Sequence, residues 1–181
     1  MNKYISLLRG INVSGQKKIK MADLKSLYEL LGFKNVVTYI QSGNVIFETA
    51  VKNRANLKTT IEQAIKKKYE FHVPVEIRTN LEIKNIIKNY PFGQVDRVED
   101  GTKVLVVFLS SKPSEVQIAD IQKYVVAPEK LVVTGKEIYL HCPNGYGKSK
   151  LSNTFIERKL AIEATTRNWK SVHKLHELSV L

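Results

Sequence analysis

The segment Asn35–Thr49, NVVTYIQSGNVIFET, decides the fold because it contains two β-rich runs separated by a tight turn. Both runs are rich in β-branched and aromatic residues, which favour strands. Gly43 lies between the runs, where a hairpin needs a residue with positive φ. The segment therefore predicts a β-hairpin whose tip is Gln41–Asn44.

The segments on either side of this hairpin alternate between strands and helices. Lys3–Val13 is a short aliphatic run with Arg9 near its end, and Val75–Thr79 is a second short run, so both predict strands. Apolar residues recur at helical spacing in Met21–Leu31 and in Arg54–Phe71, and each predicts a helix. The resulting order is β-α-β-β-α-β, which is the ferredoxin-like arrangement.

The rest of the chain repeats this order at least as far as the second helix. An N-cap at Asn80 and a polar loop after it separate the two halves. The predicted elements are a helix at Asn80–Tyr90, a loop at Pro91–Thr102, a strand buried on both faces at Lys103–Ser110, a helix at Glu115–Tyr124, a hairpin at Lys130–Cys142 with its turn at Thr134–Gly135, a helix at Ser152–Ala164, a short strand or linker at Thr165–Arg167 and a helix at Asn168–Leu178.

The predicted fold class is therefore α+β, with two ferredoxin-like halves in tandem and an extra C-terminal helix. We place the first half at residues 1–79, a helix and loop linker at 80–102, and the second half at 103–181.

The bulk composition is that of a globular protein. The chain has 181 residues, of which 43% are apolar and 25% are charged. No apolar stretch approaches the roughly 20 residues that span a bilayer, and the first residues lack the features of a signal peptide. A single cysteine, Cys142, allows no internal disulfide. We therefore expect a cytoplasmic protein with no membrane partner, either a monomer or a homodimer.

The net charge of +12 indicates an anionic partner, because excess positive charge raises the local concentration of anions. Residues 1–90 contain 16 basic and 7 acidic residues (+9), and residues 91–181 contain 13 and 10 (+3). A nucleotide or nucleic acid fits this charge. The alternative is a lysine-rich surface that only keeps the protein soluble.

The loop Arg9–Lys20, RGINVSGQKKIK, is the first candidate site. It connects a strand to a helix, and such a glycine-rich turn exposes backbone N–H groups that favour an anion. Arg9, Gly10, Asn12 and Lys18 are its candidate binding residues. The alternative is a simple connection, in which Asn12 caps or turns the chain.

Three further motifs offer polar groups. The hairpin tip contributes Gln41, Ser42 and Asn44, although turn chemistry also explains Ser42 and Asn44. The loop Cys142–Asn153 contributes Lys148 and Ser149 but fails the phosphate-loop pattern, because Cys142 stands where that pattern needs glycine. Ser149 or Ser152 could instead cap the next helix.

The third motif, Thr165–Val172, contributes Arg167 and Asn168. Arg167 could bind a carboxylate or phosphate in bidentate fashion, or Asn168 could be a helix N-cap beside an ordinary surface arginine.

Catalytic and metal-binding sets are not evident in the sequence. His141 and Cys142 are neighbours on a strand, so their side chains point to opposite faces. His173 and His176 have no third metal ligand nearby in the sequence. We therefore expect no metal and no cofactor.

Four motifs together resemble the bacterial family catalogued as domain of unknown function 1697. They are LLRGINVSGQKKIKM, TYIQSGNVIF, GYGKSKL and ATTRNWKSV. Ser14 replaces a glycine of the family pattern. The resemblance implies a cytoplasmic bacterial protein with ferredoxin-like elements, and it implies no reaction. The shared polar residues that it transfers are Arg9, Gly10, Asn12, Gln41, Ser42, Gly43, Asn44, Ser149, Arg167 and Asn168.

The leading hypothesis is binding of a phosphate-bearing ligand, a nucleotide or nucleic acid, in one basic cleft where these motifs converge. One alternative is an enzyme that acts on a small phosphorylated substrate by electrostatic stabilisation. Another is a structural or interaction module, in which the polar motifs only hold the two halves together.

Overall fold

The computed structural model describes residues 1–94, 96 and 99–181 and divides the chain into two compact units. The first unit contains residues 1–84 and 175–181, and the second contains residues 85–174. The predicted loop Pro91–Thr102 includes three residues that lie outside the described part, Val95, Arg97 and Val98. The domain boundaries at residues 79 and 103 stay predictions.

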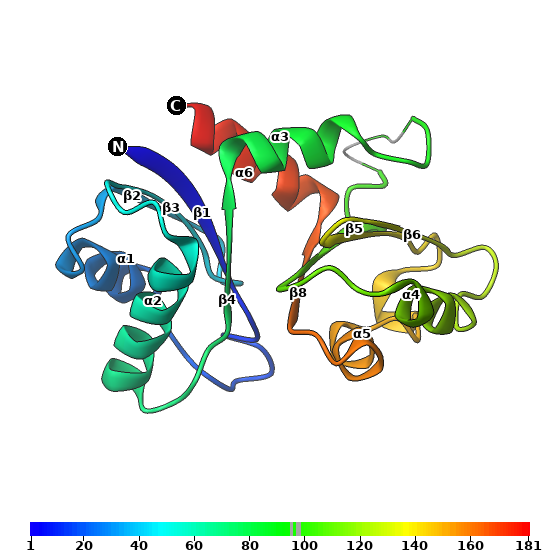
Figure 1. The fold of residues 1–181 in the computed structure, drawn as a ribbon, viewed down its shortest axis with the longest axis horizontal. Helices are drawn as coiled ribbons and strands as arrows, with labels where there is room; N and C mark the ends of the chain where they lie inside the picture. The colour runs from blue at the N-terminus through cyan, green and yellow to red at the C-terminus, as the bar shows by residue number, and fades with distance from the viewer. Residues whose placement is uncertain (95, 97–98) are drawn as a thin grey trace. The chain divides into compact units, whose positions relative to one another are not determined.

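The first unit is an antiparallel sheet with two helices on one face (Figure 1). Its strand order is β2-β3-β1-β4, so the first and last strands along the chain pair with each other. Its elements are β1 (Asn2–Leu8), α1 (Met21–Leu30), β2 (Lys34–Tyr39), β3 (Asn44–Thr49), α2 (Arg54–Tyr69) and β4 (Val75–Thr79).

Side chains that point to the helix-covered face of the sheet build the core of this unit. Tyr4, Leu8 and Phe47 belong to one buried cluster with the helix residues Leu24 and Tyr28. Tyr28 is fully buried, and burial raises the pKa of its hydroxyl although a hydrogen bond with the Ser6 side chain opposes that effect. The Ser6 and Tyr28 oxygens are 2.9 Å apart, so this bond satisfies a polar group inside the core.

The second unit repeats the same topology. Its strand order is β6-β7-β5-β8, which matches the first unit strand for strand. All six residues of β5 are buried, which confirms the prediction of a strand covered on both faces. Its elements are β5 (Val104–Leu109), α4 (Glu115–Gln122), β6 (Lys130–Thr134), β7 (Glu137–His141), the 3-10 turn η1 (Tyr146–Lys148), α5 (Asn153–Leu160) and β8 (Ala164–Asn168).

The segment predicted as either a short strand or a linker forms strand β8. It pairs with β5 over five residues, so the second half completes the β-α-β-β-α-β order. The α+β class, with two tandem ferredoxin-like halves and a C-terminal helix, is confirmed.

Two helices, α3 (Asn80–Lys88) and α6 (Trp169–Val180), each begin in one unit and end in the other. The prediction that Asn80 caps α3 is wrong, because the Glu82 amide donates to Thr79 Oγ1 at 3.2 Å and Thr79 therefore holds the capping position. Asn80 Nδ2 instead donates to the Ser179 carbonyl at 3.2 Å, and Asn80 Oδ1 lies 3.0 Å from His176 Nδ1. Asn80 thus joins the two helices within the first unit.

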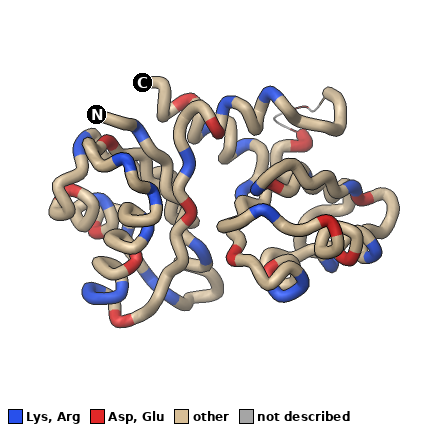
Figure 2. Tube along the Cα trace, viewed as in Figure 1, with Lys and Arg blue, Asp and Glu red and all other residues tan. Residues whose placement is uncertain are grey.

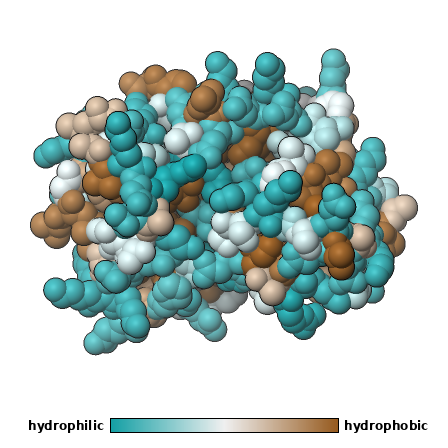
Figure 3. All heavy atoms as spheres, in the orientation of Figure 1, coloured by the Kyte–Doolittle hydropathy of each residue, from teal (hydrophilic) through white to brown (hydrophobic). Residues whose placement is uncertain are grey.

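Charged residues are spread over both units rather than confined to one element (Figure 2). On the face shown in Figure 3, hydrophobic patches are interrupted by hydrophilic side chains. Within the described ranges, no helix has the length and apolar content needed to cross a bilayer.

Candidate functional site

The loop after β1 is fastened by the side chain of Asn12. Asn12 Nδ2 donates to the Ile19 carbonyl at 2.9 Å, and Asn12 Oδ1 accepts from the Ile19 amide at 2.9 Å. The loop is also anchored by Ile11 and Ile19, both buried. Because these contacts close the loop internally, it is held in place without a ligand.

The same asparagine brings the loop to the hairpin tip. Asn12 Nδ2 makes a second bond to the Gln41 carbonyl at 2.9 Å, 29 residues away in sequence. The Leu8 amide donates to the Gly43 carbonyl at 2.8 Å. Two of the predicted motifs therefore meet at one end of the first sheet.

Gly43 occupies a crowded left-handed position in this contact. Its φ is +77°, and a Cβ atom built there would lie 2.6 Å from Ile11 Cδ1 and 2.8 Å from Leu8 Cβ. A distance below 3.0 Å cannot be accommodated without movement, so any side chain would push the hairpin tip from the loop.

Turn chemistry accounts for Ser42 and Asn44. Asn44 is fully buried, and its Nδ2 donates to the Tyr39 carbonyl at 2.9 Å and to Ser42 Oγ at 3.0 Å. Arg9 and Gly10 are half-buried, and the Arg9 amide donates to the Pro74 carbonyl at 2.9 Å. Much of the polar set in this unit thus maintains the fold.

A pocket of about 690 Å³ remains at this end of the first unit. Asn12, Lys18 and Gln41, all predicted as site residues, line it. The other lining residues are Ile19, Lys20, Met21, Ala22, Asp23 and Tyr69. Exposed Lys18 and Lys20 place two ammonium groups on a lining that contains one carboxylate, Asp23.

The first turn of α1 faces this pocket. Its N-cap is Lys20, which provides no side-chain hydrogen bond to the helix. The first N–H groups of a helix lack partners within it and carry partial positive charge, so they favour an anion. Asp23 in that turn partly offsets this charge.

Tyr69 closes one side of the pocket. Burial and the charge of Asp23 raise the pKa of its hydroxyl. That hydroxyl is buried and has no hydrogen-bond partner among the residues that the structure describes.

In the second unit, Ser149 and Asn168 have structural roles. Ser149 Oγ accepts from the Leu151 amide at 3.0 Å, whereas Ser152 is the N-cap of α5 and accepts from the Phe155 amide at 3.3 Å. Asn168 Oδ1 accepts from the Ser171 amide at 2.8 Å in the first turn of α6, as the N-cap alternative predicted.

Arg167 is buried inside the second unit, with 6% of its surface exposed. Its Nη1 donates to Thr165 Oγ1 and to the Thr166 carbonyl, both at 2.9 Å. Burial lowers the pKa of its guanidinium to about 10, because the charged form loses its hydration. The alternative of an ordinary surface arginine is therefore wrong.

Arg78 occupies the matching position of β4 and makes the matching contacts. Its Nη1 donates to the Ile77 carbonyl and to Glu76 Oε2, both at 3.1 Å. A buried arginine that bonds to residues one and two positions before it is thus a feature of both repeats.

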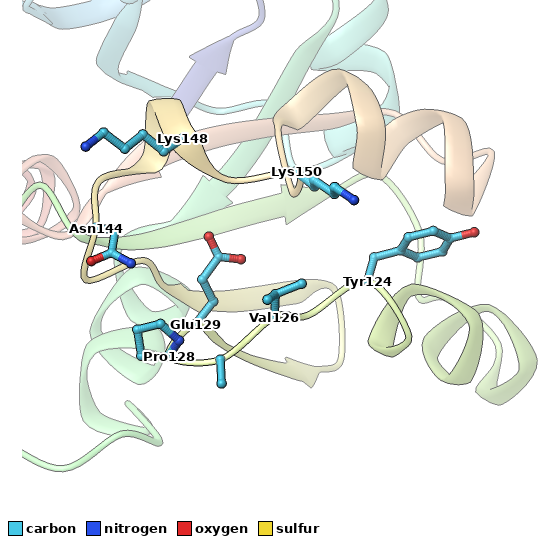
Figure 4. A pocket seen from close by; sticks show the side chains of 8 residues that line it. Tyr124, Val126, Pro128, Glu129, Asn144, Lys148 and Lys150 are labelled. Atoms are coloured by element: carbon cyan, nitrogen blue, oxygen red, sulfur yellow. The ribbon is translucent and has the colours of Figure 1, made fainter.

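A second pocket, of about 420 Å³, lies in the second unit (Figure 4). Of the predicted residues it contains Lys148. The remaining lining residues are Tyr124, Val126, Ala127, Pro128, Glu129, Asn144 and Lys150.

The predicted site residues are divided between the units. Arg9, Gly10, Asn12, Lys18, Gln41, Ser42 and Asn44 belong to the first unit, and Lys148, Ser149, Arg167 and Asn168 belong to the second. Their convergence in one cleft stays a prediction. Sequence reasoning missed Asp23, Tyr69 and Glu129, whose surroundings depend on tertiary contacts rather than on any local motif. No cluster of three or more potential metal ligands occurs in the described part of the chain.

Comparisons with known proteins identify the family. The model of the family described as Protein of unknown function (DUF1697) matches residues 1–139. A solved structure, that of the conserved bacterial protein SP0830 from Streptococcus pneumoniae, is similar with a TM-score of 0.75 and 24% sequence identity, over 98% of each chain. That likeness shows the fold. None of the curated proteins matches. The chain therefore belongs to the DUF1697 family.

Proposed function

We propose that the protein binds a phosphate-bearing ligand in the pocket of the first unit, with a nucleotide or a nucleic acid phosphate as the leading candidate. The observation that carries this proposal is that the loop after β1 and the hairpin tip enclose one pocket with Lys18 and Lys20 beside the uncapped start of α1. Lysine ammonium groups and helix N–H groups are both suited to phosphate oxygens.

In this proposal the polar residues divide into two roles. Lys18 and Lys20 bind the ligand directly. Asn12 acts as a positioning residue, because both of its amide hydrogens and its oxygen already bond to Ile19 and Gln41. We also propose a cytoplasmic location, in agreement with the single buried cysteine.

A second candidate, a structural or interaction module with no small ligand, is favoured by the internal bonds of Asn12, Asn44, Ser149 and Asn168. These bonds give the polar motifs a reason to be present even if nothing binds.

A thermal-shift screen distinguishes the two candidates. Nucleotides, phosphosugars and oligonucleotides are tested at two salt concentrations on the wild type and on Lys18→Ala/Lys20→Ala. A small ligand should raise the Tm in a saturable way, and a nucleic acid should lose affinity steeply as salt rises. The double variant should lose the effect.

The matched control is Lys66→Ala/Lys67→Ala, which removes the same charge from exposed positions at the end of α2. If both variants weaken binding equally, the attraction is a property of net charge and the pocket has no special role. If no compound stabilises the wild type, the structural candidate is favoured.

A further inference from the structure

Two segments that are distant in sequence lie beside each other at one end of the first unit (Figure 1). Lys17 Nζ, in the loop after β1, donates to the His72 carbonyl at 2.8 Å. Lys68 Nζ, in the last turn of α2, donates at 3.3 Å to the carbonyl of Asp23, which belongs to the first turn of α1. The two segments therefore run in opposite directions. They are residues 17–23 and 68–72, and we call them the paired segments.

The paired segments carry an excess of positive charge. Their charged residues are four lysines, Lys17, Lys18, Lys20 and Lys68, and two acidic residues, Asp23 and Glu70, which gives +2 with His72 neutral. None of the four lysines forms an ion pair with a carboxylate of the described residues. Lys17 and Lys68 bond to carbonyl groups, which hold the two ammonium groups in place without neutralising them.

This charge extends beyond the phosphate pocket of the first unit. Lys18 and Lys20 line that pocket, whereas Lys17 and Lys68 do not. Residues 17–23 can span at most about 20 Å, which is the length of about six base pairs of a nucleic-acid duplex. A mononucleotide held in the pocket would leave the two outer lysines without a role, so the charge suits a longer chain of phosphates.

The apolar side chains of the paired segments are turned away from solvent. Ile19 is buried, and Met21, Tyr69 and Phe71 are half-buried. Tyr69 already stacks on Phe71, with the ring centroids 5.9 Å apart. A protein partner would need an apolar centre to its interface, and a single strand would need exposed aromatic rings on which its bases could stack. A surface that offers mainly charge fits a duplex better, because the bases of a duplex are already stacked and its phosphates are dense.

We propose that the paired segments bind the phosphate backbone of a nucleic-acid duplex without reading its sequence. The proposal rests on the proposed function, since Lys18 and Lys20 contact phosphates in both. It adds Lys17 and Lys68 as further phosphate contacts and names the duplex as the ligand. Lysine is a point charge on a flexible stem, and contacts to phosphates carry no sequence information, so duplexes of any sequence should bind alike.

The test is fluorescence anisotropy of the full chain with a labelled DNA duplex of about 12 base pairs, which is longer than the paired segments. In about 50 mM salt the wild type should bind this duplex more tightly than a single strand of the same length. The logarithm of the affinity should fall with the logarithm of the salt concentration with a slope of about −3 to −4, as expected for four neutralised phosphates. AMP and poly-L-glutamate are the competitors, and at equal concentration of charge both should displace the duplex only weakly.

The decisive variant is Lys17→Gln/Lys68→Gln, which removes the two lysines outside the pocket. It should weaken duplex binding about tenfold or more and should reduce the steepness of the salt dependence by about two. Lys17→Arg/Lys68→Arg keeps the charge and should bind the duplex as the wild type does. The control Lys112→Gln/Lys130→Gln removes two charges from exposed positions of the second unit and should change the affinity little.

Four results would overturn the proposal. They are no duplex binding by the wild type in about 50 mM salt, tighter binding of the single strand or of poly-L-glutamate than of the duplex, an unchanged salt dependence in Lys17→Gln/Lys68→Gln, and an equal loss in the control variant. The phosphate pocket would survive any of these results if AMP still raised the Tm of the wild type and not that of Lys18→Ala/Lys20→Ala. If neither AMP nor the duplex binds, both proposals are wrong.

Discussion

Gly43 is required for two separate reasons, and each can be measured. Its φ of +77° lies in the left-handed region, where an L side chain is strained. In addition, Leu8 and Ile11 leave no room for a Cβ atom. Gly10 has a similar φ of +68°, but a Cβ atom there would meet nothing within 4 Å, so Gly10 shares only the first requirement.

We predict that Gly43→Ala destabilises the protein more than Gly10→Ala. Backbone strain should cost about 1–2 kcal/mol at either position, and overpacking should add about 1–3 kcal/mol at position 43 alone. Urea unfolding of both variants gives the two free energies. Equal losses would show that the hairpin tip and the loop after β1 are free to move apart.

Cys142 provides a second test at the scale of one residue. Burial raises the pKa of its thiol from 9.0 to about 11, with a further contribution from Glu129, while the Ser149 side chain acts in the opposite direction. Because the folded pKa is raised, the native state holds its proton more tightly than the unfolded chain does. The contribution of the protonated Cys142 thiol to stability is complete below pH 9 and is lost as the pH rises through 11.

The free energy of unfolding of the wild type should therefore fall by about 2 kcal/mol between about pH 8 and pH 11 through this thiol. Cys142→Ala lacks this part of the fall. Partly buried Tyr90, whose pKa is raised to about 12 by burial and by Asp100, gives both proteins a further decline. Parallel curves for the two proteins would contradict the prediction. The same burial should leave the thiol unreactive towards alkylating reagents in the native protein.

At the scale of elements, the start of α3 depends on one carboxylate. Glu82 accepts from the Thr79 amide at 2.7 Å and from Thr79 Oγ1 at 3.0 Å, and it pairs with Arg54 of α2 at 2.7 Å. Partial burial acts to raise the pKa of Glu82, but the bonds from Arg54 and Thr79 outweigh it and lower the pKa below 4.5. The Glu82 side chain thus completes the capping box that Thr79 begins and joins α3 to α2.

Since the folded pKa of Glu82 is lowered, its contribution to stability is present above about pH 4.5 and is lost as the pH falls through the folded value. We predict that Glu82→Gln unfolds more readily than the wild type at about pH 7, by about 1 kcal/mol, and that the difference shrinks towards about pH 3. Thermal melts of both proteins at the two pH values measure this difference in stability. A difference that persists unchanged in acid would assign the loss to geometry rather than to charge.

Local sequence predicted the elements well where local chemistry decides them. The stripe Leu24, Leu27, Tyr28 and Leu31 faces the core as the helical period requires, whereas Leu30 falls off the stripe and is 82% exposed. Strand β8 was ambiguous because its pairing with β5 comes from a distant part of the chain.

The candidate site could be predicted only in part, for the same reason. Motifs rich in glycine and amides are visible in the sequence, and two of them, through Asn12 and Gln41, do meet. Glu129 belongs to no motif, and only the fold brings it into one pocket with Lys148 and Lys150 of a different loop. Polar residues that serve the fold, such as Asn44 and Asn168, cannot be separated from binding residues until their hydrogen bonds are known.

At the scale of the whole molecule, the repeat is not a simple chain of two domains. Helix α6 begins in the second unit, but residues 175–181 at its end belong to the first. Leu175 is fully buried there, and His176 and Ser179 contact Asn80. The first unit is therefore assembled from two segments that are distant in sequence, and it requires synthesis of the C-terminal residues before it is complete.

We predict that deletion of residues 175–181 weakens the first unit selectively. Loss of the buried Leu175 alone should cost about 2–5 kcal/mol, and the side chain of Asn80 would lose its two partners in α6. Hydrogen exchange should show a larger loss of protection in β1, one of the two inner strands of the first sheet, than in β5, its counterpart in the second. Deletion of Leu181 alone, which is 92% exposed, is the control and should change neither strand. Equal loss in β1 and β5 would mean instead that the two units unfold as one cooperative body, so the ratio of the two protections measures how far the repeats are energetically independent.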